Sequence, residues 1–130
     1  MEQKPPLVLI VDDEAAFREI FSVKLQALGY RTEIAVDGAD GVQKAKAMKP
    51  DLILMDVQMP NVNGIDALQK IKEDDTLKGT KVLFLTNLGD PQTNAHDVEN
   101  KFAQEIGAVG YLQKFTDLDV LMQKIQSFLK

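Results

Sequence analysis

Residues 7–13, LVLIVDD, decide the fold, because a run made only of Leu, Val and Ile ends directly in two carboxylates. Such a run predicts a strand buried on both faces of a sheet. Three further apolar runs have the same layout, each followed within two residues by a polar side chain: Asp56 after 52–55, Thr86 after 82–85 and Lys114 after 109–112. If the four runs are parallel strands, their carboxyl ends share one edge of the sheet, and these side chains converge there.

Helical patterns alternate with these strands. After the first strand, apolar residues recur at i, i+3, i+4, i+8 and i+11, which predicts one stripe of a helix: Phe17, Ile20, Phe21, Leu25 and Leu28. Gly29 predicts the end of that helix. Further helices are expected over 38–48, after Asn63-Gly64, across Val98, Phe102 and Ile106, and from Leu118 to Leu129. Strands are expected near 32–36 and at 52–55, 81–85 and 108–112, and the more polar segment 32–36 suits an edge of the sheet.

The alternation predicts an α/β fold, a (βα)5 doubly wound open parallel sheet of the flavodoxin-like type. Crossover helices make the strands parallel and the connections right-handed. The strands are too few for a closed (βα) barrel, so helices are expected on both faces. The strand order 2-1-3-4-5 would make the first and third strands neighbours and bring Asp12, Asp13 and Asp56 together. We expect a single domain over residues 1–130.

Composition excludes several classes of protein. The chain has 130 residues, a net charge of −5 and no cysteine. The negative charge argues against nucleic-acid binding, which needs a basic face. The lack of cysteine excludes disulfides and thiol chemistry and fits a cytoplasmic protein. Since no apolar stretch approaches the roughly 18 residues of a membrane span, no membrane partner is expected either.

Each polar site has an ordinary structural explanation when it is taken alone. An Asp pair before a helix can cap it, Asp56 and Thr86 can serve local turns, and Lys114 can be a solvated surface lysine. Their common place at one sheet edge favours a joint site instead. Three carboxylates would repel one another, and Mg²⁺, which prefers oxygen ligands, would relieve that repulsion. One carboxylate could then act as a nucleophile towards a phosphoryl group, whose oxygens Lys114 and Thr86 would contact.

Five separated elements of the chain form an ordered set: Val11-Asp12-Asp13-Glu14, Met55-Asp56-Val57-Gln58-Met59-Pro60, Asn63-Gly64, Thr86 and Lys114. This set resembles the receiver domain of bacterial two-component response regulators, and the similarity covers nearly the whole chain. The resemblance implies a phosphorylation-switched signalling domain of the stand-alone, chemotaxis type. Asp56 would accept the phosphoryl group from a sensor histidine kinase or phosphotransfer protein. The domain would phosphorylate and dephosphorylate only itself, so we do not expect an enzyme with a separate substrate.

The resemblance also implies roles for the other residues. The implied Mg²⁺ ligands are Asp12, Asp13, Asp56 and the backbone carbonyl of Gln58. Thr86 and Lys114 would contact the phosphoryl group, and Thr86 and Tyr111 would act as the switch. The face formed by the helix expected across Val98, Phe102 and Ile106, the strand at 108–112 and the helix from Leu118 to Leu129 would bind an unidentified downstream protein.

Three departures from the family pattern affect these expectations. Phe115 follows Lys114 where the family has a proline after a cis bond, so we expect a trans peptide and a shifted loop. The stretch between Thr86 and Lys114 is longer than usual, and the excess, which lies in 88–97, forms either a longer helix or a loop. Leu88 cannot orient a hydrolytic water by hydrogen bonding, which predicts slow self-dephosphorylation.

Alternative functions remain open at this point. A receiver-like interaction module that is never phosphorylated would have the same fold. A metal-dependent phosphatase with an aspartyl nucleophile would need an Asp-x-Asp pair after the first strand, whereas Asp12 and Asp13 are adjacent. A flavodoxin-like binder of a nucleotide or flavin would need a phosphate-binding loop rich in Gly, Ser or Thr, and Asp12-Asp13-Glu14 would repel phosphate.

Overall fold

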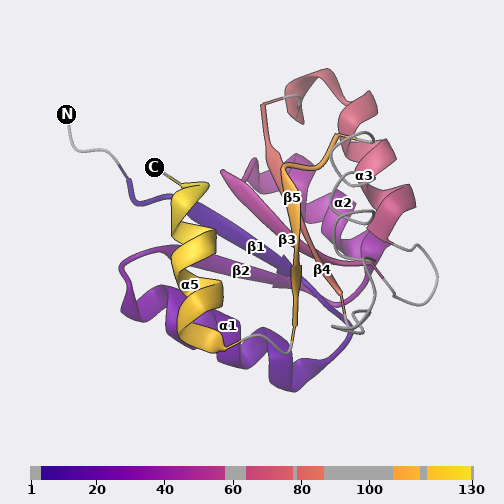
Figure 1. Cartoon of the computed structure of the whole chain (residues 1–130). Helices are drawn as coiled ribbons and strands as arrows, with labels where there is room; N and C mark the ends of the chain where they lie inside the picture. Colours follow the sequence, from indigo (N-terminus) through magenta and orange to yellow (C-terminus); the bar gives the residue numbers. More distant parts are fainter. Residues whose placement is uncertain (1–3, 58–63, 78, 87–106, 115–116, 130) are drawn as a thin grey trace.

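The computed structural model describes residues 4–57, 64–77, 79–86, 107–114 and 117–129. Five parallel strands form one sheet in the order β2-β1-β3-β4-β5 (Figure 1). They are β1 (Leu7–Val11), β2 (Arg31–Ala35), β3 (Leu52–Asp56), β4 (Lys81–Thr86) and β5 (Gly110–Gln113). The predicted fold class, strand order and parallel pairing are confirmed.

Helices cover both faces of this sheet. They are α1 (Ala15–Ala27), α2 (Gly38–Met48), α3 (Gly64–Glu73), α5 (Leu118–Ser127) and the short 3₁₀ helix η1 (Asp75–Leu77). Figure 1 shows α1 and α5 on one face and α2 and α3 on the other, which is the predicted doubly wound arrangement. The helix predicted across Val98, Phe102 and Ile106 lies outside the described residues. None of the described helices has the length and apolar character needed to cross a membrane.

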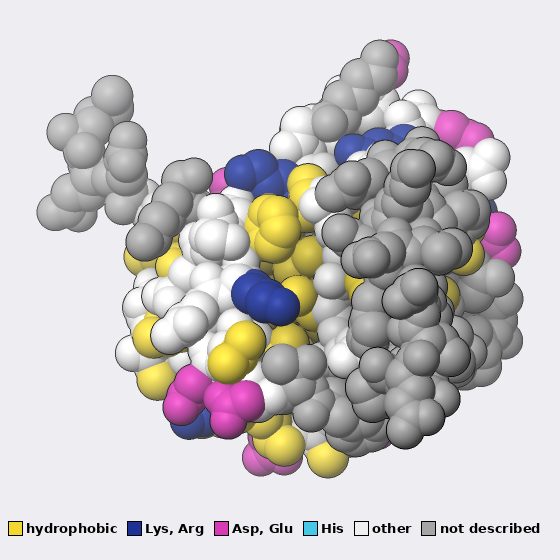
Figure 2. All heavy atoms as spheres, in the orientation of Figure 1, with side chains coloured by type: hydrophobic (Ala, Val, Ile, Leu, Met, Phe, Trp, Pro, Cys, Tyr) yellow, Lys and Arg dark blue, Asp and Glu magenta, His cyan; other side chains and the backbone are white. Residues whose placement is uncertain are grey.

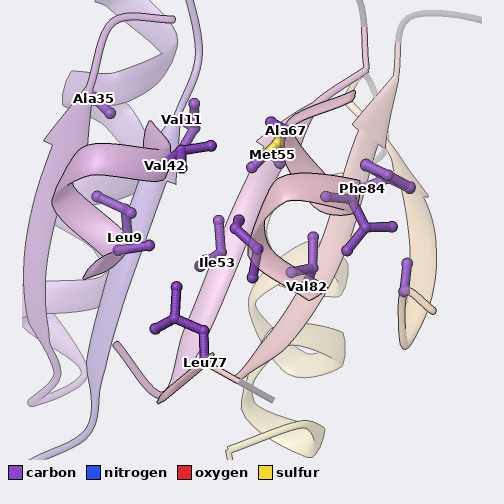
Figure 3. Close-up of a cluster of buried hydrophobic side chains, with 14 residues drawn as sticks. Leu9, Val11, Ala35, Val42, Ile53, Met55, Ala67, Leu77, Val82 and Phe84 are labelled. Carbon is purple, nitrogen blue, oxygen red and sulfur yellow. The ribbon is translucent and has the colours of Figure 1, made fainter. Parts of the chain in front are cut away.

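Alternate residues of the central strands pack into two hydrophobic cores, one on each face of the sheet. Leu9 and Val11 of β1 join the core under α2 and α3 (Figure 3). Val8 and Ile10 enter the other core, against α1 and α5. Because β1 and β3 are buried along their whole length, their sequences are continuous apolar runs rather than alternating ones. The polar side chains at their carboxyl ends are thereby held on a packed frame.

The apolar stripe predicted for α1 is only partly correct. Phe21 and Leu25 are buried, but Ile20 and Leu28 are 48% and 45% exposed. Consecutive helix residues are about 100° apart around the axis, so Ile20 turns away from the sheet when Phe21 faces it. Leu28 is already the C-cap of the helix. Gly29 ends α1 as predicted, with a φ of 96°.

The edge position of β2 is confirmed, and all of its residues except the buried Ala35 are at least partly exposed. The observed bounds of β2 and β5 differ by one or two residues from the predicted 32–36 and 108–112. Such ends depend on how pairing is counted, since the Val109 N–H already donates to the Val82 carbonyl at 2.8 Å.

On the face in Figure 2, acidic and basic side chains are interspersed with hydrophobic ones.

Candidate functional site

The sheet topology brings the predicted polar residues to one edge. Asp12 follows β1, Asp56 ends β3, Thr86 ends β4, and Lys114 follows β5. All four are buried, with exposures of 0%, 3%, 3% and 4%, whereas Asp13 is exposed. A backbone hydrogen bond holds Lys114 next to Thr86: the Lys114 N–H donates to the Thr86 carbonyl at 2.9 Å. The local explanations therefore fail for Lys114, which is not a solvated surface lysine.

Three carboxylates form an acidic cluster at this edge. Ligand oxygens of Asp12, Asp13 and Asp56 all lie within 4.8 Å of one another. Asp12 Oδ2 is buried and accepts no well-directed hydrogen bond within the described part of the chain. Hard oxygen donors at this spacing fit a small divalent cation such as Mg²⁺. Gln58, the fourth predicted ligand, lies outside the described residues.

Asp12 does not cap helix α1 in the usual way. Its Oδ1 accepts from the Glu14 N–H at 2.9 Å, and its backbone carbonyl accepts from Arg18 Nη1 at 2.7 Å. Glu14 is the N-cap of α1, and its side chain makes no capping hydrogen bond. These contacts fix the turn after β1 and leave Asp12 Oδ2 directed at the cluster. Burial raises the pKa of Asp12, although Lys114 opposes that shift.

Lys114 lies among carboxylates. Its Nζ is 2.6 Å from Asp12 Oδ2, 3.0 Å from Asp56 Oδ2 and 3.4 Å from Glu14 Oε1. The ammonium also lies over the Phe17 ring, 4.7 Å from its centroid. Burial on its own lowers the pKa of Lys114, but the hydrogen bonds and charges of Asp12 and Asp56 outweigh it, and the pKa is raised. Lys114 is therefore a cation near neutral pH and offsets part of the cluster's negative charge.

Gly64 lets α3 begin directly against the backbone of Asp56. A Cβ at Gly64 would lie 2.5 Å from the Asp56 carbonyl oxygen and 2.9 Å from Val57 Cα. The Gly64 N–H donates to the Val57 carbonyl at 3.0 Å. This contact explains why the turn glycine of the motif matters, since a side chain there would displace the end of β3.

Tyr111 is half-buried on β5, beside Phe84 of β4, and packs against the core under α2 and α3. Its predicted switch role stays a prediction. The Lys114–Phe115 peptide, Leu88 and the 88–97 segment lie outside the described residues.

Sequence reasoning missed three residues at the edge of the cluster. From the sequence, Glu14 has only a place in the acidic motif, Arg18 has no role, and Phe17 belongs to the helix stripe. The available signal is spacing: Glu14 at the N-cap and Phe17 and Arg18 in the first turn of α1 lie at i, i+3 and i+4, directly after the Asp pair. Such residues share a helix face, so one of them near the strand end implies the others nearby.

Comparisons with known proteins agree with this geometry. The family model described as "Response regulator receiver domain" matches residues 8–126. The chain is 40% identical to the chemotaxis protein CheY of Treponema pallidum, over 97% of this chain and 84% of that protein. It is 30% identical to the protein PilH of Pseudomonas aeruginosa, over 94% and 96%. The structure of CheY4 from Vibrio cholerae superposes with a TM-score of 0.83 at 30% identity, covering 95% of this chain and 98% of that one.

Other relatives are longer than this chain. The transcriptional regulator RpaA of Synechocystis is 32% identical over 96% of this chain, which spans 49% of that protein's length. The match therefore concerns one part of such regulators.

Proposed function

The chain belongs to the response regulator receiver domain family, and on this premise we propose that Asp56 accepts a phosphoryl group from a sensor histidine kinase or phosphotransfer protein. Membership of this family implies phosphorylation-switched signalling. The observation that carries the proposal is the position of Asp56. It is a buried carboxylate at the end of β3, 3.0 Å from the Lys114 ammonium and within the cluster formed with Asp12 and Asp13.

The proposed transfer uses the Asp56 carboxylate as the nucleophile. A carboxylate oxygen forms a bond to phosphorus while the bond from phosphorus to the donor's imidazole nitrogen breaks, and that nitrogen keeps the electron pair. Lys114 then contacts a phosphoryl oxygen as a point charge, and the Thr86 hydroxyl donates to another. Burial of these groups excludes water and strengthens both contacts.

Mg²⁺ is the proposed cofactor. Asp12, Asp13 and Asp56, with the backbone carbonyl of Gln58, would hold it. The ion would supply positive charge that offsets the negative charge of the phosphoryl oxygens. This assignment is supported by the acidic cluster, whose oxygen ligands suit a small divalent cation.

The proposed output is a change in protein binding. Phosphorylation would draw Thr86 towards Asp56 and let Tyr111 repack. This would bias a two-state surface made by β5, α5 and the segment predicted as a helix across Val98, Phe102 and Ile106. The chain would act as a single cytoplasmic domain over residues 1–130 with no separate substrate. Its downstream partner would be a protein rather than nucleic acid or a membrane, in keeping with the net charge of −5.

The test is phosphorylation by a small donor. Purified protein is incubated with acetyl phosphate, with and without Mg²⁺, and its intact mass is measured. We expect addition of one phosphoryl group that requires Mg²⁺ and is lost in Asp56→Asn. Asp51→Asn is the matched control, since Asp51 precedes the opposite end of the same strand and should leave phosphorylation intact.

Absence of any Mg²⁺-dependent adduct on the wild type would refute the proposal and favour an interaction module that is not phosphorylated. Steady turnover of an unrelated phosphomonoester would instead favour the phosphatase.

A further inference from the structure

Among the described residues, Lys114 has one carboxylate partner that is not part of the acidic cluster. Of the three described acids that contact its ammonium, Asp12 and Asp56 belong to the group with mutually close ligand oxygens. Glu14 does not, yet its Oε1 lies 3.4 Å from Lys114 Nζ. Glu14 is 100 residues away from Lys114 in sequence, so the pair exists only through the fold.

The local structure frees Glu14 for this contact. Ser, Thr, Asp and Asn are the usual N-cap residues because their short side chains reach the first free N–H groups of a helix. Glu14 occupies the N-cap of α1 without any such bond. Its own N–H donates to Asp12 Oδ1, which ties its backbone to the cluster, while its carboxylate extends to Lys114.

Cation binding creates a conflict that Glu14 can resolve. The oxygens that Lys114 contacts at 2.6 and 3.0 Å belong to Asp12 and Asp56, two of the four residues proposed to hold Mg²⁺. Mg²⁺ and the Lys114 ammonium would then compete for the same carboxylates, so the ammonium must move away or its contacts must weaken. Among the described residues, the other contacts of Nζ are Glu14 Oε1, at the N-cap of α1, and the Phe17 ring, in its first turn. The Glu14 side chain is 56% exposed, so it can follow the ammonium as it moves.

We propose that Glu14 is a positioning residue that holds the Lys114 ammonium when a divalent cation takes the oxygens of Asp12 and Asp56. The proposal rests on the proposed function, because it assumes the cation site. It gives Glu14 a task distinct from that of the cluster: Glu14 accepts Lys114 rather than the cation. Without its charge, the ammonium stays on Asp12 and Asp56 and opposes cation binding.

The test is the Mg²⁺ affinity of the full chain, measured by isothermal titration calorimetry without any phosphodonor. Glu14→Gln should raise the dissociation constant by roughly threefold or more, as for other coupled contacting residues. Glu19→Gln is the control, because Glu19 lies on α1, is exposed, and forms no ion pair within the described part of the chain. It removes the same charge and should change the constant much less.

A second arm removes the ammonium. In a Lys114→Met background, Glu14→Gln should cost no more affinity than Glu19→Gln does, because no cation then needs the Glu14 carboxylate. Equal losses of Mg²⁺ affinity in Glu14→Gln and Glu19→Gln in the wild-type background would overturn the inference. A larger loss in Glu14→Gln than in Glu19→Gln that persists in the Lys114→Met background would overturn it as well. If Lys114→Met does not fold, the comparison of Glu14→Gln with Glu19→Gln decides alone. If the wild type binds Mg²⁺ and Glu14→Gln loses no more affinity than Glu19→Gln, only this inference is refuted. If the wild type binds no Mg²⁺, the proposed cation site and this inference are both refuted.

Discussion

The two carboxylate oxygens of Asp12 have different partners. Oδ1 accepts the Glu14 N–H, and Oδ2 faces the Lys114 ammonium at 2.6 Å without a well-directed hydrogen bond. Asp12 is fully buried, so its charged form loses its hydration. Asp12 thus stabilises a turn through Oδ1, while burial of its charged form lowers the free energy of unfolding.

The titration of Asp12 should therefore reduce stability as pH rises. Burial raises the pKa of Asp12 in the folded protein, so the folded state binds this proton more tightly than the unfolded chain does. Its contribution to the free energy of unfolding is largest below the ordinary carboxyl pKa of about 4 and declines as pH rises through the folded-state value. In urea denaturation without divalent cations, the stability of wild type relative to Asp12→Asn should fall from pH 4 upwards. A relative stability that grows with pH would contradict the prediction.

Gly64 is the second residue on which the site depends. Replacement by Ala places a Cβ 2.5 Å from the Asp56 carbonyl oxygen, and backbone atoms cannot yield as a flexible side chain can. We expect Gly64→Ala to lower the free energy of unfolding by about 1–3 kcal/mol and to weaken phosphorylation of Asp56. Urea denaturation and the acetyl phosphate assay measure the two effects.

Gly79→Ala is the control for Gly64, because a Cβ at Gly79 meets nothing within 4 Å. It should change neither stability nor phosphorylation appreciably. Equal stability and equal phosphorylation in Gly64→Ala and Gly79→Ala would show that the close approach at Gly64 determines neither property.

At the scale of elements, the C-terminal end of α1 follows a defined capping pattern. The Gly29 N–H donates to the Gln26 carbonyl at 3.0 Å, and the Tyr30 N–H reaches the Leu25 carbonyl at 3.1 Å. This pair of bonds is the Schellman motif, which needs a left-handed residue after the cap. Gly29 supplies it with a φ of 96°.

Gly29→Ala should destabilise the protein through backbone conformation alone. A Cβ there would meet nothing within 4 Å, so the cost comes from the left-handed φ, about 1–2 kcal/mol for a residue with a Cβ. Gly29→Asn should cost less, because Asn tolerates this region. Thermal unfolding of the three proteins measures the order, and an Ala variant as stable as the wild type would refute the argument.

The elements also show what could be predicted from the sequence. Strand order and the meeting of Asp12 with Asp56 could be predicted, because burial on both faces leaves a continuous apolar run and few topologies are allowed. The exposure of Ile20 could not be predicted, since the spacing of apolar residues on a helix does not show which of them the sheet covers. Neither could the pairing of Glu14 with Lys114, which depends on side-chain directions at opposite ends of the chain.

At the scale of the whole molecule, the order of the strands determines the chemistry at their ends. β1 and β3 are neighbours although a strand and two helices separate them in sequence. Their carboxyl ends hold like charges side by side, and β4 and β5 add a hydroxyl and an ammonium on the same edge. Unfolding separates all of these groups, so any ligand that needs them together binds only the folded chain.

Mg²⁺ should therefore stabilise the whole fold by linkage. At a free concentration 100 times its dissociation constant, a cation that binds only the folded state adds about 2.7 kcal/mol to the free energy of unfolding. Urea denaturation with and without Mg²⁺ should show this gain in the wild type and in Asp51→Asn, whose substitution lies at the far end of β3. Asp56→Asn should lose most of the gain, because it removes one of the three clustered carboxylates. A gain of the same size in Asp56→Asn would place the cation elsewhere on the protein and refute the assignment of Asp56 as a ligand.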